Sequence, residues 1–223
     1  MKLACIKPLV PICFSLAITS ACLFGAAGRL DWSNAWVLLG LSLIAGLAFV
    51  VGRDPELAAE RRNVKAGKSW DKVLVGITVL FGPITMWVTA GLDDRFHWSN
   101  GMSPWSFPAG VAAAVLAAAL IAWAMRSNKF FSSVVRIQTD RGHTVIDGGP
   151  YQFIRHPGYA GMSIFTLATP LILGSRWALV PAMCTSSAIV IRTILEDMTL
   201  RNELDGYADY ARRVRYRLLP AIW

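Results

Sequence analysis

The sequence predicts an all-α protein, a polytopic membrane helix bundle with five to six transmembrane spans that include a C-terminal helical hairpin. Hydrophobic residues make up 55% of the 223 residues and charged residues only 16%. A soluble domain is about half apolar and about one quarter charged. Six stretches carry no charge, and most reach the roughly 18 to 20 residues that a bilayer-spanning helix needs. They cover residues 9–28, 32–52, 73–92, 104–125, 158–175 and 177–191.

The first stretch has two interpretations. Lys2 and Lys7 precede an apolar run that ends in small residues, and this pattern also fits a cleaved signal peptide or a lipoprotein box ending at Cys22. The run is longer than the roughly 7 to 15 apolar residues of a signal-peptide core. A retained transmembrane helix is therefore the favoured interpretation.

The last two stretches predict the hairpin. Gly174 and Ser175 suit the turn between them. Pro170 and Pro181 are expected to kink the two arms, because packed neighbours can satisfy the backbone groups that proline leaves free. The second arm, 177–191, is short, but a charged helix is expected to continue it, since Arg192 and Glu196, and likewise Asp197 and Arg201, are four residues apart and share a face.

The distribution of cations predicts the orientation. Lys and Arg crowd the second and fourth connections and the C-terminal segment, whereas the first, third and fifth connections hold only Arg29, Arg95 and Arg176. Cytoplasmic loops carry the excess of Lys and Arg, so both termini are expected in the cytoplasm, at a bacterial inner membrane or at the endoplasmic reticulum. The formal charge of +8 adds attraction to anionic lipid headgroups and gives no reason to expect nucleic acid as a partner.

Several kinds of chemistry are disfavoured. The four cysteines lie in or beside apolar spans without a C-x-x-C pair, and His97 falls on the other side of the membrane from His143 and His156, so no metal is expected. Neither a G-x-G-x-x-G after a strand-like run nor a Walker pattern occurs. No internal repeat or low-complexity linker is present, and a single membrane domain, 1–223, is predicted.

Most polar sequence motifs lie between Gln138 and Tyr216. RIQTDRGHTVIDGGPYQFIRHPGYAG ends inside the fifth span, and RTILEDMTLRNELDGYADYARRVRY follows the sixth. Residues 127–149 are mixed in polarity and are expected to form a cytoplasmic loop against the bundle. Pro157 suits the first turn of a helix, and the free N–H groups of such a turn attract a carboxylate or phosphate.

These residues resemble the isoprenylcysteine carboxyl methyltransferase family, integral membrane enzymes that transfer a methyl group from S-adenosylmethionine to a lipidated cysteine carboxylate. The matching blocks are G-P-Y ending at Tyr151, R-H-P-x-Y-x-G at 155–161, R-T-x-x-E-D-x-x-L at 192–200 and Y-x-x-Y-x-x-R-V at 207–214. The sequence departs from the family's usual pattern at Gly158 and Asp197, and in two shortened spacings, one between Gln138 and His143.

The resemblance implies that 1–126 holds N-terminal transmembrane spans and that 127–223 is the cofactor-binding and catalytic part, with a pocket on the cytoplasmic side. It implies Arg192 as the substrate-contacting residue. It also implies an S-adenosylmethionine site formed by Gln138, His143, Thr144, Val145, Ile146, Tyr151, His156, Pro157, Gly158, Tyr159 and Glu196.

Physical chemistry supports these roles. Tyrosine faces can stabilise a sulfonium cation, and Glu196 can accept hydrogen bonds from an ammonium or ribose hydroxyl group. An ionised carboxylate needs no base to accept a methyl group, so an arginine fork and in-line alignment would be the main requirements. Because an arginine at membrane depth must pair, Glu196, one turn away, is the expected partner of Arg192.

Other interpretations remain open. The acceptor could be a phospholipid amine or a small thiol, and a sterol-type membrane reductase that uses NADPH would share the helical architecture. The tyrosines could be interfacial anchors, His156 could be structural, and Arg192 with Glu196 could be an ordinary surface pair. The arginines of 212–217 are expected to face lipid headgroups. In every enzymatic case the partner is a lipophilic substrate from the bilayer.

Overall fold

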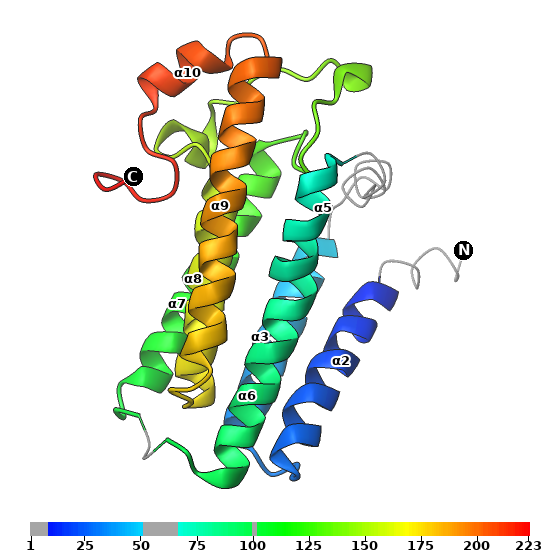
Figure 1. The fold of residues 1–223 in the computed structure, drawn as a ribbon, viewed down its shortest axis with the longest axis vertical. Helices are drawn as coiled ribbons and strands as arrows, with labels where there is room; N and C mark the ends of the chain where they lie inside the picture. Colours follow the sequence, from blue (N-terminus) through cyan, green and yellow to red (C-terminus); the bar gives the residue numbers. More distant parts are fainter. Residues whose placement is uncertain (1–8, 51–66, 100–101) are drawn as a thin grey trace.

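The computed structural model describes residues 9–50, 67–99 and 102–223, which form a bundle of long helices covered at one end by shorter segments (Figure 1). No strand occurs within these ranges, so the predicted all-α class is confirmed. Lys2, Lys7 and Cys5, and the cations Arg53, Arg61, Arg62 and Lys65 of the second connection, lie outside the described residues.

The spans agree with the apolar stretches of the sequence. Five helical segments of the described chain are long and apolar enough to cross a membrane, and α8 is apolar but has only 17 residues. The long helices are α2 (Val10–Ala27), α3 (Ser33–Val50), the continuous run α5 (Ser69–Val75), η2 (Gly76–Phe81) and α6 (Gly82–Phe96), then α7 (Ser106–Ser127), α8 (Pro157–Leu173) and α9 (Leu179–Glu203). Short elements are η3 (Thr139–Arg141), η4 (Gly149–Gln152) and α10 (Tyr207–Arg213).

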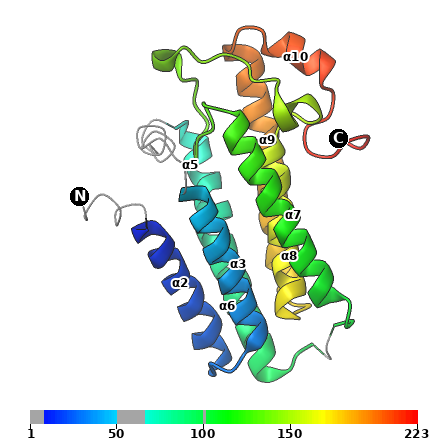
Figure 2. The ribbon, with the colours of Figure 1, turned by 180° about the vertical axis from the view of Figure 1, so that it is seen from behind.

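Close helix packing depends on small residues. α7 lies along α8, α8 packs against α9, and α2 packs against α6 (Figures 1 and 2). At the α7–α8 contact a Cβ on Gly161 would lie 2.6 Å from Ile121 and 3.0 Å from the carbonyl oxygen of Ala117. Only glycine permits this approach, which lets α7 and α8 pack closely.

The hairpin forms where it was predicted, with one correction. Gly174 ends α8 in the left-handed region, at a φ of 75°, and α9 begins at Leu179. Pro170 lies inside α8 as expected. The expected kink at Pro181 is wrong, because Pro181 lies in the first turn of α9, where its missing N–H has no intrahelical partner to lose.

One buried carboxylate joins the hairpin to the third span. Asp93, 3% exposed near the end of α6, accepts hydrogen bonds from the Ser99 hydroxyl at 2.6 Å and the Ser175 hydroxyl at 2.5 Å. This end of the bundle is opposite to the one covered by the shorter segments (Figure 1).

The covering segments come from two parts of the chain. Residues 128–156 cross between α7 and α8, and residues 204–223 return from α9 to lie beside them (Figures 1 and 2). Backbone N–H groups of Arg155 and His156 donate to the carbonyls of Tyr216 and Arg217, both at 2.9 Å. The Tyr210 hydroxyl donates to the Tyr151 carbonyl at 2.8 Å. The two segments therefore form one structured cap, in which Tyr210 is 1% exposed.

Candidate cofactor pocket

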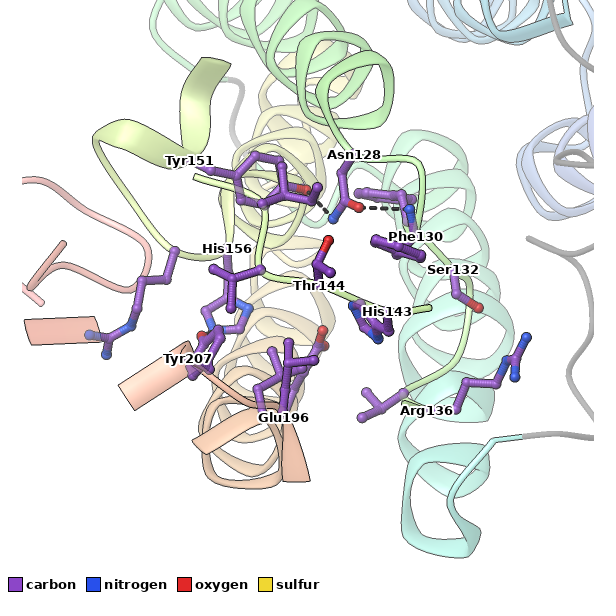
Figure 3. A pocket seen from close by; sticks show the side chains of 18 of the residues that line it. Asn128, Phe130, Ser132, Arg136, His143, Thr144, Tyr151, His156, Glu196 and Tyr207 are labelled. Carbon is purple, nitrogen blue, oxygen red and sulfur yellow. Dashed lines mark hydrogen bonds between the residues drawn. The ribbon is translucent and has the colours of Figure 1, made fainter. Parts of the chain in front are cut away.

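A pocket opens between the cap and the ends of α8 and α9 (Figure 3). Its empty volume, including the part open to solvent, is about 820 Å³. Nine of the twelve predicted site residues line it: His143, Thr144, Val145, Ile146, Tyr151, His156, Gly158, Tyr159 and Glu196. These residues come from the loop before α8, from the start of α8 and from α9, so the fold brings the separate sequence blocks to one cavity.

Gln138 is a support of the pocket rather than part of its wall. Its side chain is 1% exposed, donates from Nε2 to the Phe130 carbonyl at 2.7 Å and accepts from Arg141 at 2.5 Å. Its backbone N–H donates to Nδ1 of His143 at 3.2 Å. Gln138 thus fixes the loop that carries His143, and both the nitrogen and the oxygen of its side-chain amide bond within that loop.

Pro157 is the first residue of α8, as predicted, and His156 is the residue before it. Gly158 has a steric role, because a Cβ there would lie 2.7 Å from the ring of Phe131. The rings of His156 and Tyr159 stack with centroids 5.9 Å apart, and both side chains line the pocket. The start of α8 therefore presents aromatic surface to the cavity.

The expected pair between Arg192 and Glu196 is wrong. Glu196 accepts a hydrogen bond from the Tyr159 hydroxyl at 2.5 Å, whereas Arg192 pairs with Asp71 of α5 at 2.6 Å. The physical reason is burial: Asp71 is 0% exposed and requires a cation, while Glu196, half-buried, is satisfied by a neutral hydroxyl. Arg192 stays close to the pocket, since its guanidinium lies 5.1 Å from the centroid of the Tyr159 ring.

Asp197 is the centre of a second buried network. It is 1% exposed and pairs with Arg155 at 2.9 Å, with Arg201 as predicted and with Arg217, both at 3.1 Å. The Tyr207 hydroxyl donates to Asp197 at 2.9 Å. Burial, together with the Asp197 carboxylate, raises the pKa of Tyr207 well above its ordinary range, so this phenol stays protonated as a donor.

The network corrects two interpretations. Arg217 turns inward to Asp197, whereas Arg212, Arg213 and Arg215 are exposed and fit the expected charge band. Tyr151 and Tyr207 are 7% and 4% exposed, which excludes interfacial anchoring for both. Burial of these rings follows from the cap, whose two segments enclose them.

His143 is held as a neutral ring. Partial burial, with the nearby charges of Arg136 and Arg141, lowers the pKa of His143 to about 4 from its ordinary value of 6.5. The ring packs on Phe130 with centroids 4.4 Å apart and accepts the Gln138 N–H. Because Nδ1 accepts, the neutral imidazole carries its proton on Nε2 and can donate a hydrogen bond within the pocket without adding charge to it.

Sequence reasoning missed several pocket and supporting residues. Asn128, Phe130 and Ser132 line the cavity, and Asn128 donates to the Tyr151 hydroxyl at 3.2 Å. Asp71 carried a usable signal, because an acidic residue beside an apolar span requires a partner. Among the described residues no group of three or more His, Cys, Asp or Glu side chains could hold a metal ion.

The fold and site define the class first: a multi-pass helical membrane protein with a tyrosine-rich pocket at one end of its bundle. The sequence model of the isoprenylcysteine carboxyl methyltransferase (ICMT) family matches residues 110–202. Residues 110–202 are therefore similar to this family, and the resemblance predicted from the sequence motifs is confirmed over this region.

Individual relatives agree. The protein-S-isoprenylcysteine O-methyltransferase of Rattus norvegicus is 24% identical over 139 residues, 59% of this chain and 47% of the rat protein. The enzyme of the same name from Schizosaccharomyces pombe is 31% identical over 51 residues, which cover 23% of this chain and 22% of the yeast protein. The chain thus matches less than half the length of either relative.

A solved structure supports the fold. The eukaryotic intramembrane Ras methyltransferase ICMT superposes with a TM-score of 0.53 at 14% identity, covering 100% of this chain and 87% of that one. The similarity therefore extends to the N-terminal spans, which lie outside the region of the family match. None of these three relatives is named for an amine or thiol acceptor or for a reductase activity.

Proposed function

We propose that this protein transfers a methyl group from S-adenosylmethionine to the carboxylate of a lipophilic acceptor of the isoprenylcysteine type. The observation that carries the proposal is the convergence of nine predicted cofactor residues in one pocket beside Arg192. The role of Arg192 as the acceptor contact is implied by the family resemblance. The short distance between its guanidinium and the ring of Tyr159, which lines the pocket, supports this role.

The pocket chemistry fits the proposed cofactor. Glu196 gives one carboxylate oxygen, Oε2, to Tyr159, while Oε1 has no hydrogen-bond partner among the described residues and can accept from an ammonium or hydroxyl group. The stacked rings of His156 and Tyr159 offer a face to a sulfonium cation. When bound, S-adenosylmethionine would supply an electrophilic methyl group.

The chain's residues would then provide position rather than acid–base chemistry. An ionised carboxylate is already nucleophilic, so orientation by Arg192 and exclusion of water by the cap are the proposed contributions. A hydrophobic acceptor tail would enter the site from the bilayer, between the apolar helices of the bundle. A base would be required only for an amine or thiol acceptor.

A methyl-transfer assay tests the proposal. Purified full-length protein receives methyl-labelled S-adenosylmethionine and an S-prenylated N-acetylcysteine, either as the acid or as its amide. We expect label in the acid only, in a product that releases methanol on alkaline treatment, as a methyl ester does. Label that resists alkali, or equal transfer to the amide, would contradict carboxyl methylation.

We also propose that the pocket and both termini face the cytoplasm. The segment between α7 and α8 and the C-terminus lie at the same end of the bundle, and the α2–α3 connection lies at the other (Figure 1). Cysteine-accessibility labelling in intact cells or sealed vesicles should place Gly142 and Trp223 on the cytoplasmic side and Asp31 on the opposite side. The reverse labelling pattern would overturn the orientation.

A further inference from the structure

A buried ion pair connects the N-terminal spans to the catalytic part of the chain. Asp71 of α5 is 0% exposed and Arg192 of α9 is 3% exposed. The pair is bidentate, since Nε donates to Oδ1 at 2.6 Å and Nη2 donates to Oδ2 at 3.1 Å. Asp71 lies outside the region that matches the ICMT family, residues 110–202, so the family match assigns it no role.

Backbone groups of the segment after α7 satisfy further hydrogen-bonding groups of the pair. The backbone N–H of Val135 donates to Oδ2 of Asp71 at 2.7 Å, and Nη2 of Arg192 donates to the Ser133 carbonyl at 2.7 Å. Val135 itself lines the pocket. Both oxygens of Asp71 and both N–H groups of Nη2 are therefore engaged, and neither side chain can rotate without breaking several bonds.

One edge of the guanidinium remains available. Nη1 of Arg192 makes no hydrogen bond with any described residue, and it is not among the fully buried nitrogens that lack a partner. Cζ of Arg192 lies 5.1 Å from the centroid of the Tyr159 ring, whose hydroxyl donates a hydrogen bond to Glu196. Arg192 is four residues before Glu196 on α9, which places it about 6 Å further along the helix, toward the centre of the bundle.

We propose that Asp71 is the positioning residue for Arg192, holding the Nε and Nη2 side of the guanidinium so that Nη1 alone contacts the acceptor carboxylate. This inference rests on the proposed function. Displacement of Asp71 by the acceptor would leave a carboxylate buried without a cation, which is costly, so Asp71 stays in place during the reaction. The acceptor carboxylate is then selected by one oriented N–H donor, Nη1, rather than by an excess of positive charge.

The variant Asp71→Asn tests this, because it keeps the shape of the side chain and removes its charge. The readout is binding competition between two probes, an S-prenylated N-acetylcysteine acid and its amide. In the unchanged protein the acid should bind at least about tenfold more tightly than the amide, as expected for a bond to a charged group. Asp71→Asn should reduce this preference by about fivefold or more, leave S-adenosylmethionine affinity within about twofold, and lower kcat/KM mainly through KM.

Asp94→Asn is the matched control. Asp94 lies on α6 of the same span and makes two hydrogen bonds of 2.9 Å to Arg29, far from the pocket, so the acid preference should not change. If Asp71→Asn no longer binds S-adenosylmethionine, Asp71→Glu, which keeps the charge, replaces it in the same comparison.

Three outcomes would overturn the inference. A stronger acid preference in Asp71→Asn would mean that Asp71 competes with the acceptor, and an unchanged preference would mean a purely structural pair. No acid preference in the unchanged protein would exclude Arg192 as a carboxylate contact. The proposed function fails separately, when the unchanged protein forms no alkali-labile methyl product.

Discussion

Two buried carboxylates flank the pocket, and their surroundings differ. Asp71 meets one guanidinium in a one-to-one pair, whereas Asp197 meets three arginines, a tyrosine hydroxyl and the ring of His156, whose Nε2 lies 3.5 Å from Oδ1. A paired arginine with an unused edge can act on a ligand. A carboxylate surrounded by several donors has no free group to offer a ligand. Its interactions instead order the chain around it.

The two networks also connect different parts of the sequence. The partners of Asp197 all lie between Arg155 and Arg217, so this centre fixes the cap to α9. Asp71 and Arg192 instead join the third span to the sixth, across 121 positions. Asp197 therefore holds the cap on α9, whereas the pair of Asp71 and Arg192 ties two long spans to each other.

The largest effect is expected from Asp197→Ala. Removing one partner from a buried charge network usually costs about 3 to 5 kcal/mol, and here it would leave Arg155 with no buried anion. Thermal unfolding and limited proteolysis should show loss of the cap, with new cleavage between 204 and 217. Asp209→Ala, in an exposed pair with Arg212, is the control and should cost less than about 1 kcal/mol. Equal stability of the two variants would remove the distinction between the networks.

Glu196→Gln and His156→Ala should weaken S-adenosylmethionine binding by about 1.5 to 3 kcal/mol each, the range for a lost hydrogen bond to a charged group. Calorimetry on the purified protein measures this directly. Glu203→Gln, in an exposed pair with Lys68, should bind the cofactor normally. If both pocket variants also bind normally, the pocket residues serve structure and the cofactor site lies elsewhere.

Arg192→Lys should reduce turnover by roughly ten- to a hundredfold, equivalent to about 1.4 to 2.7 kcal/mol of lost transition-state stabilisation. A lysine keeps the charge near Asp71 but cannot keep a bidentate pair and present a second edge. S-adenosylmethionine affinity should change little. Near-normal turnover would contradict the acceptor role of Arg192, and lost cofactor affinity would move this residue into the cofactor site.

The smallest effect concerns His143, whose pKa is lowered to about 4. A histidine with a depressed folded pKa takes up its proton more readily when unfolded, so stability is unaffected above pH 6.5 and falls as pH decreases from 6.5 toward 4. NMR titration of labelled imidazoles, with His143→Gln to assign the signal, should find this ring neutral at pH 6. A midpoint near 6.5 would show that the loop leaves the ring solvated.

Much of the architecture could be predicted from the sequence, because membrane helices are recognisable from long stretches without charged residues. All six apolar stretches became helices, and the Gly174 turn is where composition placed it. The clustered motifs, read through a family resemblance, also anticipated nine residues that line the pocket. Local rules suffice for these features, since a span or a helix start is decided by neighbouring residues.

The sequence by itself therefore determined the class of fold, the approximate positions of the long helices and the stretch of chain that lines the pocket. Tertiary structure alone decided which charges pair: Arg192 with Asp71 rather than Glu196, and Asp197 with arginines from both segments of the cap. Spacing along a helix shows which groups can meet. A buried ion pair forms instead where desolvation makes an unpaired charge most costly, and that depends on how distant helices pack.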